Sequence, residues 1–173
     1  MKALLIVVDY QVDFVTGSLG FPEAVKLEEP ICRKIEAARA AGADVIYTMD
    51  THTEQYLQTA EGRALPIPHC IKGTPGWALY GKTADLLKDA PCFEKPAFGC
   101  AELLPFLREK QYGRVELCGL VSNLCVLTNT ILAKTALPEA EIVVDAACTA
   151  SADPKQNAEA LDLLEALQVR VIR

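Results

Sequence analysis

Three residues far apart in the chain carry side chains that together could attack a carbonyl carbon. Cys125 ends the segment Gly119-Leu-Val-Ser-Asn-Leu-Cys and lies in the first turn of an expected helix. The N–H groups and the dipole at a helix N-terminus favour thiolate over thiol and can hold an oxyanion. Asp9 could take the thiol proton and Lys95 could stabilise the thiolate. The pair would supply what a cysteine nucleophile needs without using a histidine.

Other residues compete for these roles. Asp9 could instead cap a helix or a turn, and an isolated lysine is usually solvated. Asp13 and Asp145 are rival carboxylates that the spacing does not exclude. Cys100 also precedes a helix, but no strand leads directly into it. Seven cysteines without a CxxC pair form neither a disulfide framework nor a zinc ribbon, so we interpret the other six, at positions 32, 70, 92, 100, 118 and 148, as small core residues.

A second group of polar side chains could bind a metal ion. The two histidines of the chain, His52 and His69, fall in one stretch with Asp50 and Glu61. In an extended segment Asp50 and His52 point the same way, because alternate side chains of a strand share a face. Glu54 is an alternative to Glu61. Two imidazoles and two carboxylates suit Zn²⁺, Fe²⁺ or Mn²⁺, so we expect one divalent metal ion here, zinc before the others.

Apolar runs alternate with helical patterns along the chain. We expect strands at residues 3–8, 45–48, 92–94, 115–120, 141–144 and 170–172, and helices at 30–41, 102–110, 122–136 and from 153 onward. This alternation predicts a three-layer α/β fold, with a six-stranded, mainly parallel sheet and helices on both faces. In such a sheet ligands bind outside the carboxyl ends of the strands, near the switch point. Asp9, Lys95 and Cys125 each follow an expected strand.

Two local patterns refine the expected helices. Leu124, Leu127 and Ile131 share one face of the helix at 122–136. Asp153, followed by Pro154 and then Gln156, predicts a capping box at the start of the last long helix.

Composition limits the classes of partner. The chain has 173 residues, 51% of them hydrophobic, and a net charge of −6 from 17 basic and 23 acidic residues. This length fits one domain, and an acidic chain without a basic cluster is a poor nucleic-acid binder. The apolar run at 3–8 is far shorter than the roughly 18 residues of a membrane span and lacks a signal-peptide cleavage site. We expect a soluble, cytoplasmic domain with neither nucleic-acid nor membrane partners.

These residues resemble the isochorismatase-like cysteine hydrolases, and among them most closely the nicotinamidases (pyrazinamidases). The resemblance covers residues 1–173 as a single domain. Three segments carry it: Ala3-Leu-Leu-Ile-Val-Val-Asp-Tyr-Gln-Val-Asp-Phe14, Glu94-Lys-Pro-Ala-Phe-Gly99 and Gly119-Leu-Val-Ser-Asn-Leu-Cys-Val126. It implies a catalytic triad of Asp9, Lys95 and Cys125, and favours Asp9 over Asp13. It also implies a cis peptide between Leu120 and Val121, with the N–H groups of Val121 and Cys125 forming an oxyanion hole.

The metal-binding stretch distinguishes members of this family. Isochorismatases lack it, whereas nicotinamidases resemble the present Asp50, His52 and His69, followed by Gly73-Thr-Pro-Gly76. Glu61 matches the glutamate version of the fourth ligand, after allowing one extra residue before His69. The resemblance also implies that a flat ring packs against Phe14, Leu19 and Phe98, with Trp77 as a candidate for a further aromatic wall.

The activity implied is that of a nicotinamidase. Nicotinamide would be hydrolysed to nicotinate and ammonia through a Cys125 thioester, as in NAD salvage, with the metal ion orienting the pyridine ring. One alternative is a related cysteine hydrolase acting on another small amide or a carbamoyl or ureido compound. Another is a non-catalytic metal-binding or redox-sensing domain with Cys125 as an oxidisable thiol. The expected partner is a small-molecule amide, and the family often forms dimers or larger assemblies, so a homo-oligomer is also considered.

Overall fold

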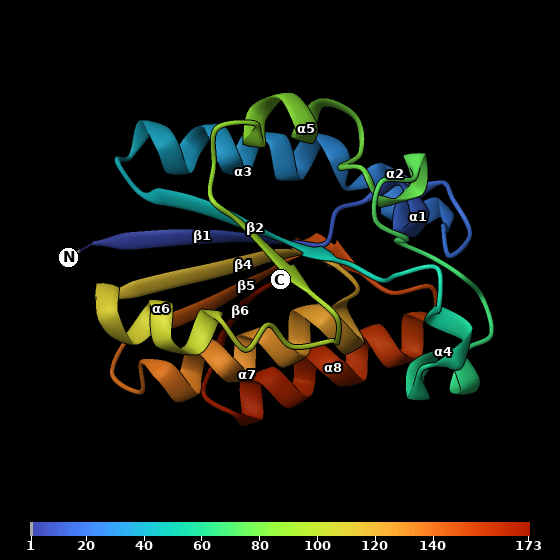
Figure 1. The fold of residues 1–173 in the computed structure, drawn as a ribbon. Coiled ribbons are helices and arrows are strands. Elements are labelled where there is room, and N and C mark those ends of the chain that lie inside the picture. The colour runs from blue at the N-terminus through green and yellow to red at the C-terminus, as the bar shows by residue number, and fades with distance from the viewer. Residues whose placement is uncertain (1) are drawn as a thin grey trace.

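A six-stranded parallel sheet forms the centre of the molecule in the computed structural model, which describes residues 2–173 (Figure 1). The strand order is β3-β2-β1-β4-β5-β6, and every neighbouring pair is parallel. The strands are β1 (Ala3–Val8), β2 (Asp44–Asp50), β3 (Cys92–Lys95), β4 (Arg114–Leu120), β5 (Glu141–Ala150) and β6 (Arg170–Ile172). The predicted α/β fold with a six-stranded parallel sheet is therefore confirmed.

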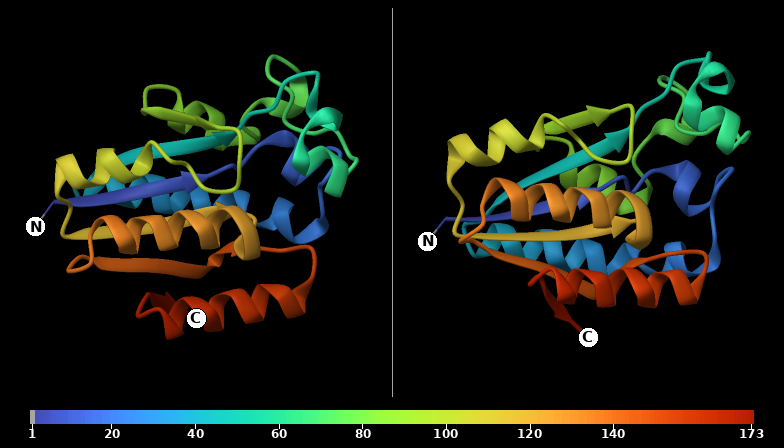
Figure 2. Two further views of the ribbon diagram at one scale, coloured as in Figure 1. Left: turned by 60° about the horizontal axis from the view of Figure 1, so that its bottom comes forward. Right: turned by 90° about the horizontal axis from the view of Figure 1, so that it is seen from below.

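Helices cover both faces of this sheet, as the views in Figures 1 and 2 show. One face carries α3 (Glu28–Ala40) and α5 (Gly81–Leu87), and the other carries α6 (Leu103–Lys110), α7 (Leu127–Ala136) and α8 (Pro154–Ala166). Short elements complete the chain: α1 (Val12–Val15), α2 (Pro22–Lys26), α4 (Ala60–Ala64), the 3₁₀ turns η1 (Tyr56–Gln58) and η2 (Pro75–Trp77), and a π-helical turn, η3 (Ser122–Val126). Within residues 2–173, no helix has the length and apolar character needed to cross a membrane.

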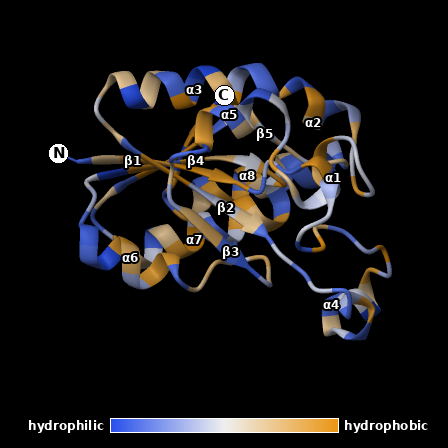
Figure 3. Ribbon diagram, turned by 45° about the horizontal axis from the view of Figure 1, so that its top comes forward, coloured by the Kyte–Doolittle hydropathy of each residue, from blue (hydrophilic) through white to orange (hydrophobic). Residues whose placement is uncertain are grey.

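The apolar sequence of β1 follows from burial on both sides. Leu4, Ile6 and Val8 pack into the core beneath α6, α7 and α8, while Leu5 and Val7 pack into the core beneath α3 and α5. A parallel strand in this position has no polar face, so its sequence is a continuous hydrophobic run. β1 is accordingly drawn mainly in the hydrophobic colours of Figure 3.

The connections out of β1 place the switch point of the sheet between β1 and β4. The chain leaves β1 toward β2 and β3 on one side, and returns to β4 on the other. At this point β4 approaches β1 so closely that a Cβ at Gly119, whose φ is +111°, would lie 2.1 Å from the carbonyl oxygen of Val8. Only glycine fits there. Asp9 follows β1, and Cys125 follows β4 through η3, so both residues lie at the switch point, where α/β proteins bind ligands.

The start of α8 differs from the prediction in one respect. The carboxylate of Asp153 caps the helix by accepting the N–H groups of Lys155 and Gln156, as expected. The reciprocal half of the capping box is absent, because the N–H of Asp153 donates to the hydroxyl of Ser151 at 3.4 Å. The Gln156 side chain instead accepts a hydrogen bond from Asn123 at 2.8 Å, which ties α8 to η3.

Candidate active site

Lys95 lies at the centre of a buried polar cluster at the carboxyl ends of the strands. Its side chain is fully buried, and its Nζ lies 2.7 Å from Oδ2 of Asp9 and 3.4 Å from Sγ of Cys125. Oδ1 of Asp50 lies 3.3 Å from the same nitrogen, and the carbonyl oxygen of Ala97 lies 2.9 Å away. An ammonium group deep in a protein needs such partners, because an unpaired buried charge is very costly. The structure thus brings together the three residues predicted for the triad.

Asp9 is held in place by β2. It directly follows β1 with a φ of +46°, and its N–H donates to the carbonyl oxygen of Thr48 at 3.2 Å. The Thr48 hydroxyl donates to Oδ1 of Asp9 at 2.6 Å. Burial raises the pKa of Asp9 above its ordinary value, against the opposing effect of the Lys95 charge. A buried carboxyl group with a raised pKa is a better proton acceptor than an exposed one.

Cys125 lies in η3, between a cis peptide bond joining Leu120 to Val121 and the start of α7. Its side chain is only 4% exposed. Burial raises the pKa of the Cys125 thiol well above its ordinary value; the Asp9 carboxylate raises it further, and the Lys95 ammonium lowers it. Burial therefore opposes the thiolate that the helix terminus is expected to favour, and the Lys95 ammonium offsets part of this effect.

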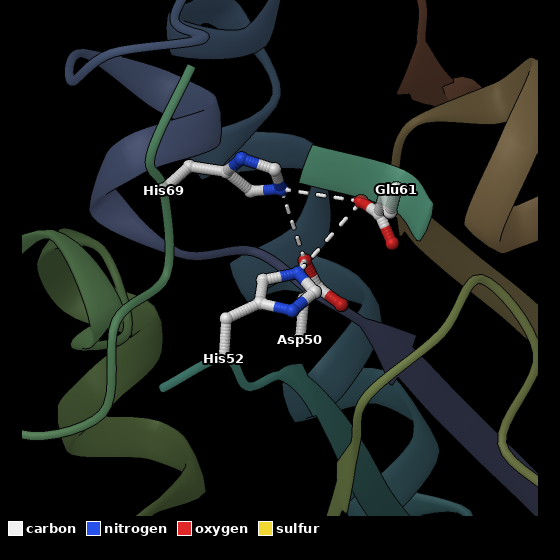
Figure 4. A group of neighbouring side chains, drawn as sticks. All are labelled: Asp50, His52, Glu61 and His69. Carbon is white, nitrogen blue, oxygen red and sulfur yellow. Dashed lines mark hydrogen bonds and ion pairs between the residues drawn. The ribbon is translucent and has the colours of Figure 1, made fainter. Parts of the chain in front are cut away.

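Four side chains form a second cluster beside this one (Figure 4). Nε2 of His52 lies 3.0 Å from Oδ2 of Asp50, and Nε2 of His69 lies 3.4 Å from the same oxygen. Oε1 of Glu61 lies 3.7 Å from both imidazole nitrogens. All four donor atoms lie within 4.8 Å of one another. The structure thus gathers all four residues that the sequence analysis proposed as metal ligands.

The spacing of these donor atoms fits a bound metal ion. Four ligand atoms at about 2.0–2.2 Å from a tetrahedral zinc ion are about 3.3–3.6 Å apart. The separations of 3.0, 3.4 and 3.7 Å around Asp50, His52, His69 and Glu61 bracket that range. His69 is also oriented for coordination, because its Nδ1 lies 2.8 Å from the carbonyl oxygen of Ile67. Donation to that carbonyl leaves the Nε2 lone pair free to bind a divalent metal ion.

Aromatic rings pack around the two imidazoles. The ring of Tyr56, which is almost fully buried, lies 4.8 Å from the ring of His52 and 4.9 Å from that of His69, measured between centroids. Phe14 packs against His69 at 5.6 Å. The Tyr56 hydroxyl donates to the carbonyl oxygen of Leu65 and so anchors the ring. This packing fixes the imidazole orientations and excludes water from one side of the cluster.

Gln11 fixes the backbone of Asp50. Its side-chain oxygen accepts the N–H of Asp50 at 2.8 Å, and its Nε2 donates to the carbonyl oxygens of Asp50 at 2.9 Å and Trp77 at 2.8 Å. Sequence reasoning missed both Gln11 and Thr48. The available signal was a polar residue at or just beyond the end of an apolar strand, where the side chain is buried in the structure.

The rival residues lie elsewhere or make other contacts. The Asp13 carboxylate accepts the backbone N–H of Cys70 at 2.8 Å. Asp145, on β5, forms an ion pair with Lys34 of α3 at 2.7 Å. Glu54 is exposed and lies outside the metal-binding group. The Sγ of Cys100 lies 3.5 Å from a carboxylate oxygen of Glu102.

Of the remaining cysteines, four are buried as expected, but Cys92 is exposed at the start of β3. The interpretation of Cys92 as a core residue is wrong, because β3 is an edge strand.

The residues expected to pack the substrate ring are only partly assembled. Phe14 packs against His69 of the metal-binding cluster. Leu19 packs against the core on the α3 side of the sheet, and Phe98 is 42% exposed. Nε1 of Trp77 donates to the hydroxyl of Thr51 at 2.9 Å, which places its ring beside the chain between Asp50 and His52. Trp77 therefore stays a candidate for the further aromatic wall.

Comparison with known proteins shows the family to which the chain belongs. An isochorismatase domain model matches residues 3–173. A protein of Bacillus subtilis (strain 168), described as an uncharacterized isochorismatase family protein, PncA, is 35% identical over 143 residues, which cover 76% of this chain and 78% of that protein.

Solved structures extend the similarity to three dimensions. The nicotinamidase/pyrazinamidase PncA of Bacillus subtilis has a TM-score of 0.90 at 28% identity, over 100% of both chains. The pyrazinamidase of Pyrococcus horikoshii, solved in complex with zinc, has a TM-score of 0.87 at 27% identity, over 100% of this chain and 99% of that one. These relatives indicate amidohydrolase activity. The resemblance noted in the sequence is confirmed, and the chain belongs to the isochorismatase family.

Proposed function

We propose that this protein is a nicotinamidase, which hydrolyses nicotinamide to nicotinate and ammonia. The observation that carries the proposal is the position of Lys95 Nζ, which contacts Asp9 and Cys125 on one side and Asp50 of the metal-binding cluster on the other. One small site therefore combines a nucleophile with a set of metal ligands. A substrate that has both a carboxamide and a ring nitrogen suits such a site.

The first chemical step is attack of Cys125 Sγ on the carboxamide carbon. The thiol is protonated at rest, since its pKa lies well above the ordinary value. Asp9 removes the proton as the C–S bond forms, and its raised pKa makes it a suitable acceptor. The pKa of Lys95 also lies above its ordinary value: burial lowers it, but the charges of Asp9, Cys125 and Asp50 raise it more. Lys95 therefore stays cationic and stabilises the negative charge that develops on sulfur.

The negative charge on the substrate oxygen is held by backbone N–H groups. Val121, which directly precedes the turn η3, and Cys125, within that turn, are the proposed donors. Removing one such donor from an enzyme typically costs about 10²–10³ in kcat. Asp9 then gives its proton to the leaving nitrogen, so that ammonia departs and a thioester remains on Cys125.

Hydrolysis of the thioester completes the cycle. Asp9, now ionised again, removes a proton from a water molecule that attacks the thioester carbon. As the C–S bond breaks, Asp9 returns this proton to Cys125 Sγ, and the product leaves as nicotinate after losing its own carboxyl proton to solvent. The same carboxyl group thus acts as base and then acid in each of the two steps, and Lys95 holds it beside the sulfur throughout.

Asp50, His52, Glu61 and His69 would hold the divalent ion, for which zinc is the proposed identity because a mixed nitrogen and oxygen set with this spacing suits it. A metal ion held there could accept a pyridine nitrogen as a further ligand beyond these four residues, and this contact would orient the ring. Orientation of this kind can contribute several kcal/mol to lowering a barrier, on the order of what well-aligned intramolecular reactions show. Phe14, Leu19 and Phe98 are the proposed contacts of the ring itself.

Ammonia release by the metal-loaded protein tests this function. Nicotinamide, benzamide and a ureido acid are offered to the wild type and to Cys125→Ala. We expect turnover of nicotinamide, much slower turnover of benzamide, which lacks the ring nitrogen, and background rates for Cys125→Ala. Cys100→Ala is the matched control, since Cys100 is also buried but lies outside the cluster around Lys95.

Other outcomes would point to other functions. Faster hydrolysis of the ureido acid than of nicotinamide would identify a related carbamoyl hydrolase instead. Undiminished turnover by Cys125→Ala would remove the nucleophile assignment, and equal rates on benzamide and nicotinamide would remove the role of the ring nitrogen.

A further inference from the structure

Asn129 lies one helical turn after Cys125, on α7, and its side chain is fully buried. Its Oδ1 accepts the N–H of Cys100 at 2.8 Å. Its Nδ2 donates to two carbonyl oxygens, that of Phe98 at 3.1 Å and that of Cys125 at 2.8 Å. Both hydrogens of the amide and its oxygen are therefore used. None of these contacts is made to a neighbouring side chain; all go to backbone groups of two separate segments.

The two segments are those that carry the proposed catalytic residues. The first runs from Lys95, at the end of β3, through Ala97 to Cys100 before α6. Ala97 supplies the carbonyl oxygen that accepts a hydrogen bond from Lys95 Nζ at 2.9 Å. The second segment is the η3 turn with Cys125. A single amide thus joins the backbone on both sides of the contact between Lys95 Nζ and Cys125 Sγ.

The first segment is also pressed closely against α7. A Cβ at Gly99 would lie 3.2 Å from Cδ1 of Leu132 and 3.3 Å from Cγ2 of Thr128, closer than side chains normally pack. The absence of a side chain at Gly99 therefore lets this segment approach the helix near enough for Asn129 to bond Phe98 and Cys100, the residues on either side.

The hydrogen-bonding groups of the amide explain why a hydroxyl or a carboxylate at position 129 could not replace it. Thr130, the next residue on α7 and also fully buried, donates its hydroxyl to the carbonyl oxygen of Val126 at 2.6 Å, four residues earlier. A hydroxyl at position 129 could likewise bond Cys125 but is too short to reach the other segment. A carboxylate would face two carbonyl oxygens with no hydrogen to donate. Only the amide serves all three backbone groups.

We propose that Asn129 is a positioning residue, which sets the distance between Lys95 Nζ and Cys125 Sγ by clamping their two backbone segments together. The expected effect on catalysis rests on the proposed function. The effect on the reactivity of the Cys125 thiol does not, and it can be measured without turnover. Misplacing reacting groups by about 1 Å can cost about 10²-fold in rate, so a clamp of this kind matters for kcat more than for substrate binding.

The test compares Asn129→Ser with Thr130→Val in the metal-loaded protein. Asn129→Ser keeps a hydroxyl that can bond the Cys125 carbonyl and releases only the segment after Lys95. Thr130→Val removes an equally buried side-chain hydrogen bond from the same helix, but one that reaches only Val126 at the end of η3 and not the segment after Lys95, so it joins nothing across the two segments. For each variant kcat and KM are measured by ammonia release, and folding by circular dichroism and thermal unfolding.

A second readout does not depend on turnover. Iodoacetamide alkylation of Cys125 is followed by mass spectrometry between pH 6 and 10, relative to Cys92, which is exposed and serves as the internal reference in every sample. The charged groups around the thiol are Asp9 from the end of β1, Asp50 from β2 and Lys95 from β3. Moving the ammonium away reduces the thiolate fraction, so alkylation slows near neutral pH and recovers at high pH. A merely looser structure would instead speed alkylation at every pH.

We expect Asn129→Ser to lower kcat by about 10- to 100-fold with KM within about threefold, and to shift the Cys125 alkylation profile to higher pH. Thr130→Val should leave both within about twofold. A folded Asn129→Ser with unchanged kcat and unchanged alkylation profile would overturn the proposal.

If Asn129→Ser does not fold, Gly99→Ala decides, because it pushes the same segment off α7; an unchanged Cys125 profile there would also overturn it. If the wild type hydrolyses no amide, the proposed function fails, and the alkylation profiles alone decide the role of Asn129.

Discussion

Asp50 presents its two carboxylate oxygens to different partners: Oδ1 lies 3.3 Å from Nζ of Lys95, while Oδ2 faces the imidazoles of His52 and His69. Burial alone would raise the pKa of Asp50. Hydrogen bonds from the two histidines and the charge of Lys95 lower it by more, so the pKa lies below its ordinary value. The group therefore stays ionised. One carboxylate belongs both to the metal-binding cluster and to the charge cluster around the thiol. A substitution in one cluster should therefore change the electrostatics of the other.

Loss of the Asp50 charge should harm catalysis beyond its effect on metal binding. Asp50→Asn and His69→Asn each remove one proposed ligand, but only Asp50 faces Lys95. The Asp50 charge raises the pKa of Asp9, so without it Asp9 is a weaker base. At saturating zinc, we expect kcat per bound metal ion to be at least about tenfold lower for Asp50→Asn than for His69→Asn. Elemental analysis and ammonia release on the same samples measure this ratio; a ratio near one would contradict it.

Glu61, and not Glu54, should determine metal affinity. Oε1 of Glu61 lies 3.7 Å from Nε2 of both His52 and His69, whereas Glu54 is exposed. We expect Glu61→Gln to weaken zinc binding by about 10- to 100-fold, because the amide oxygen carries no charge. Glu54→Gln is the matched control and should bind as the wild type does. Competition with a chromophoric chelator gives both affinities. Equal affinities for the two variants would remove Glu61 from the site.

The positions of the strand-end residues could be predicted because buried parallel strands have an unambiguous sequence. The run from Ala3 to Val8 is apolar throughout, so its end and the polar Asp9 beyond it are visible without a structure. What the sequence does not contain is the order of the strands. Lys95 on β3 reaches Asp9 across the end of β2, and this contact follows only from the arrangement of the three strands in the sheet.

The start of α7 shows why hydrophobic periodicity was a poor guide near the site. Leu124 and Ile131 share a face as predicted, yet they are 40% and 38% exposed. The buried face carries Cys125, Asn129 and Ala133 instead. Its polar residues are buried because they hydrogen-bond the backbone of neighbouring segments, a gain that hydropathy does not register. Asn129 was missed for this reason.

The hydroxyl of Thr48 should set the acidic limb of the pH profile. It donates to Oδ1 of Asp9 at 2.6 Å, and this bond stabilises the charged carboxylate and lowers its pKa. Removing it in Thr48→Val raises the pKa of Asp9 further, so the base is protonated at higher pH. We expect kcat/KM to fall more at pH 6 than at pH 8. Thr149→Val, which removes another buried strand hydroxyl, is the control. The pH dependence of kcat/KM checks this, and a parallel loss at both pH values would contradict it.

Lys34 on α3 should stabilise the fold without affecting the site. Its Nζ lies 2.5 Å from a carboxylate oxygen of Glu116 on β4 and 2.7 Å from one of Asp145 on β5, and the three side chains are only 16–20% exposed. Lys34→Met leaves two partly buried carboxylates without a cation. We expect the free energy of unfolding to fall by about 1–3 kcal/mol, below the cost for a fully buried pair. Burial lowers the pKa of Lys34, but hydrogen bonds from the two carboxylates raise it more, to above its ordinary value.

A raised lysine pKa means that the stabilisation is complete below the pKa of the unfolded chain and is lost only as the pH rises past the folded value. The difference between Lys34→Met and the wild type should therefore be the same at pH 6 and pH 8. Lys155→Met is the matched control, because Lys155 pairs with Glu159 on the exposed face of α8, where such pairs contribute about 0.5 kcal/mol or less. Urea unfolding at both pH values measures all three proteins. Equal losses of unfolding free energy for the two variants would show that the Lys34 cluster stabilises the fold no more than an ordinary surface pair does. A loss for Lys34→Met that grows between pH 6 and pH 8 would show that the pKa of Lys34 in the folded protein is lowered, and not raised by its two carboxylates.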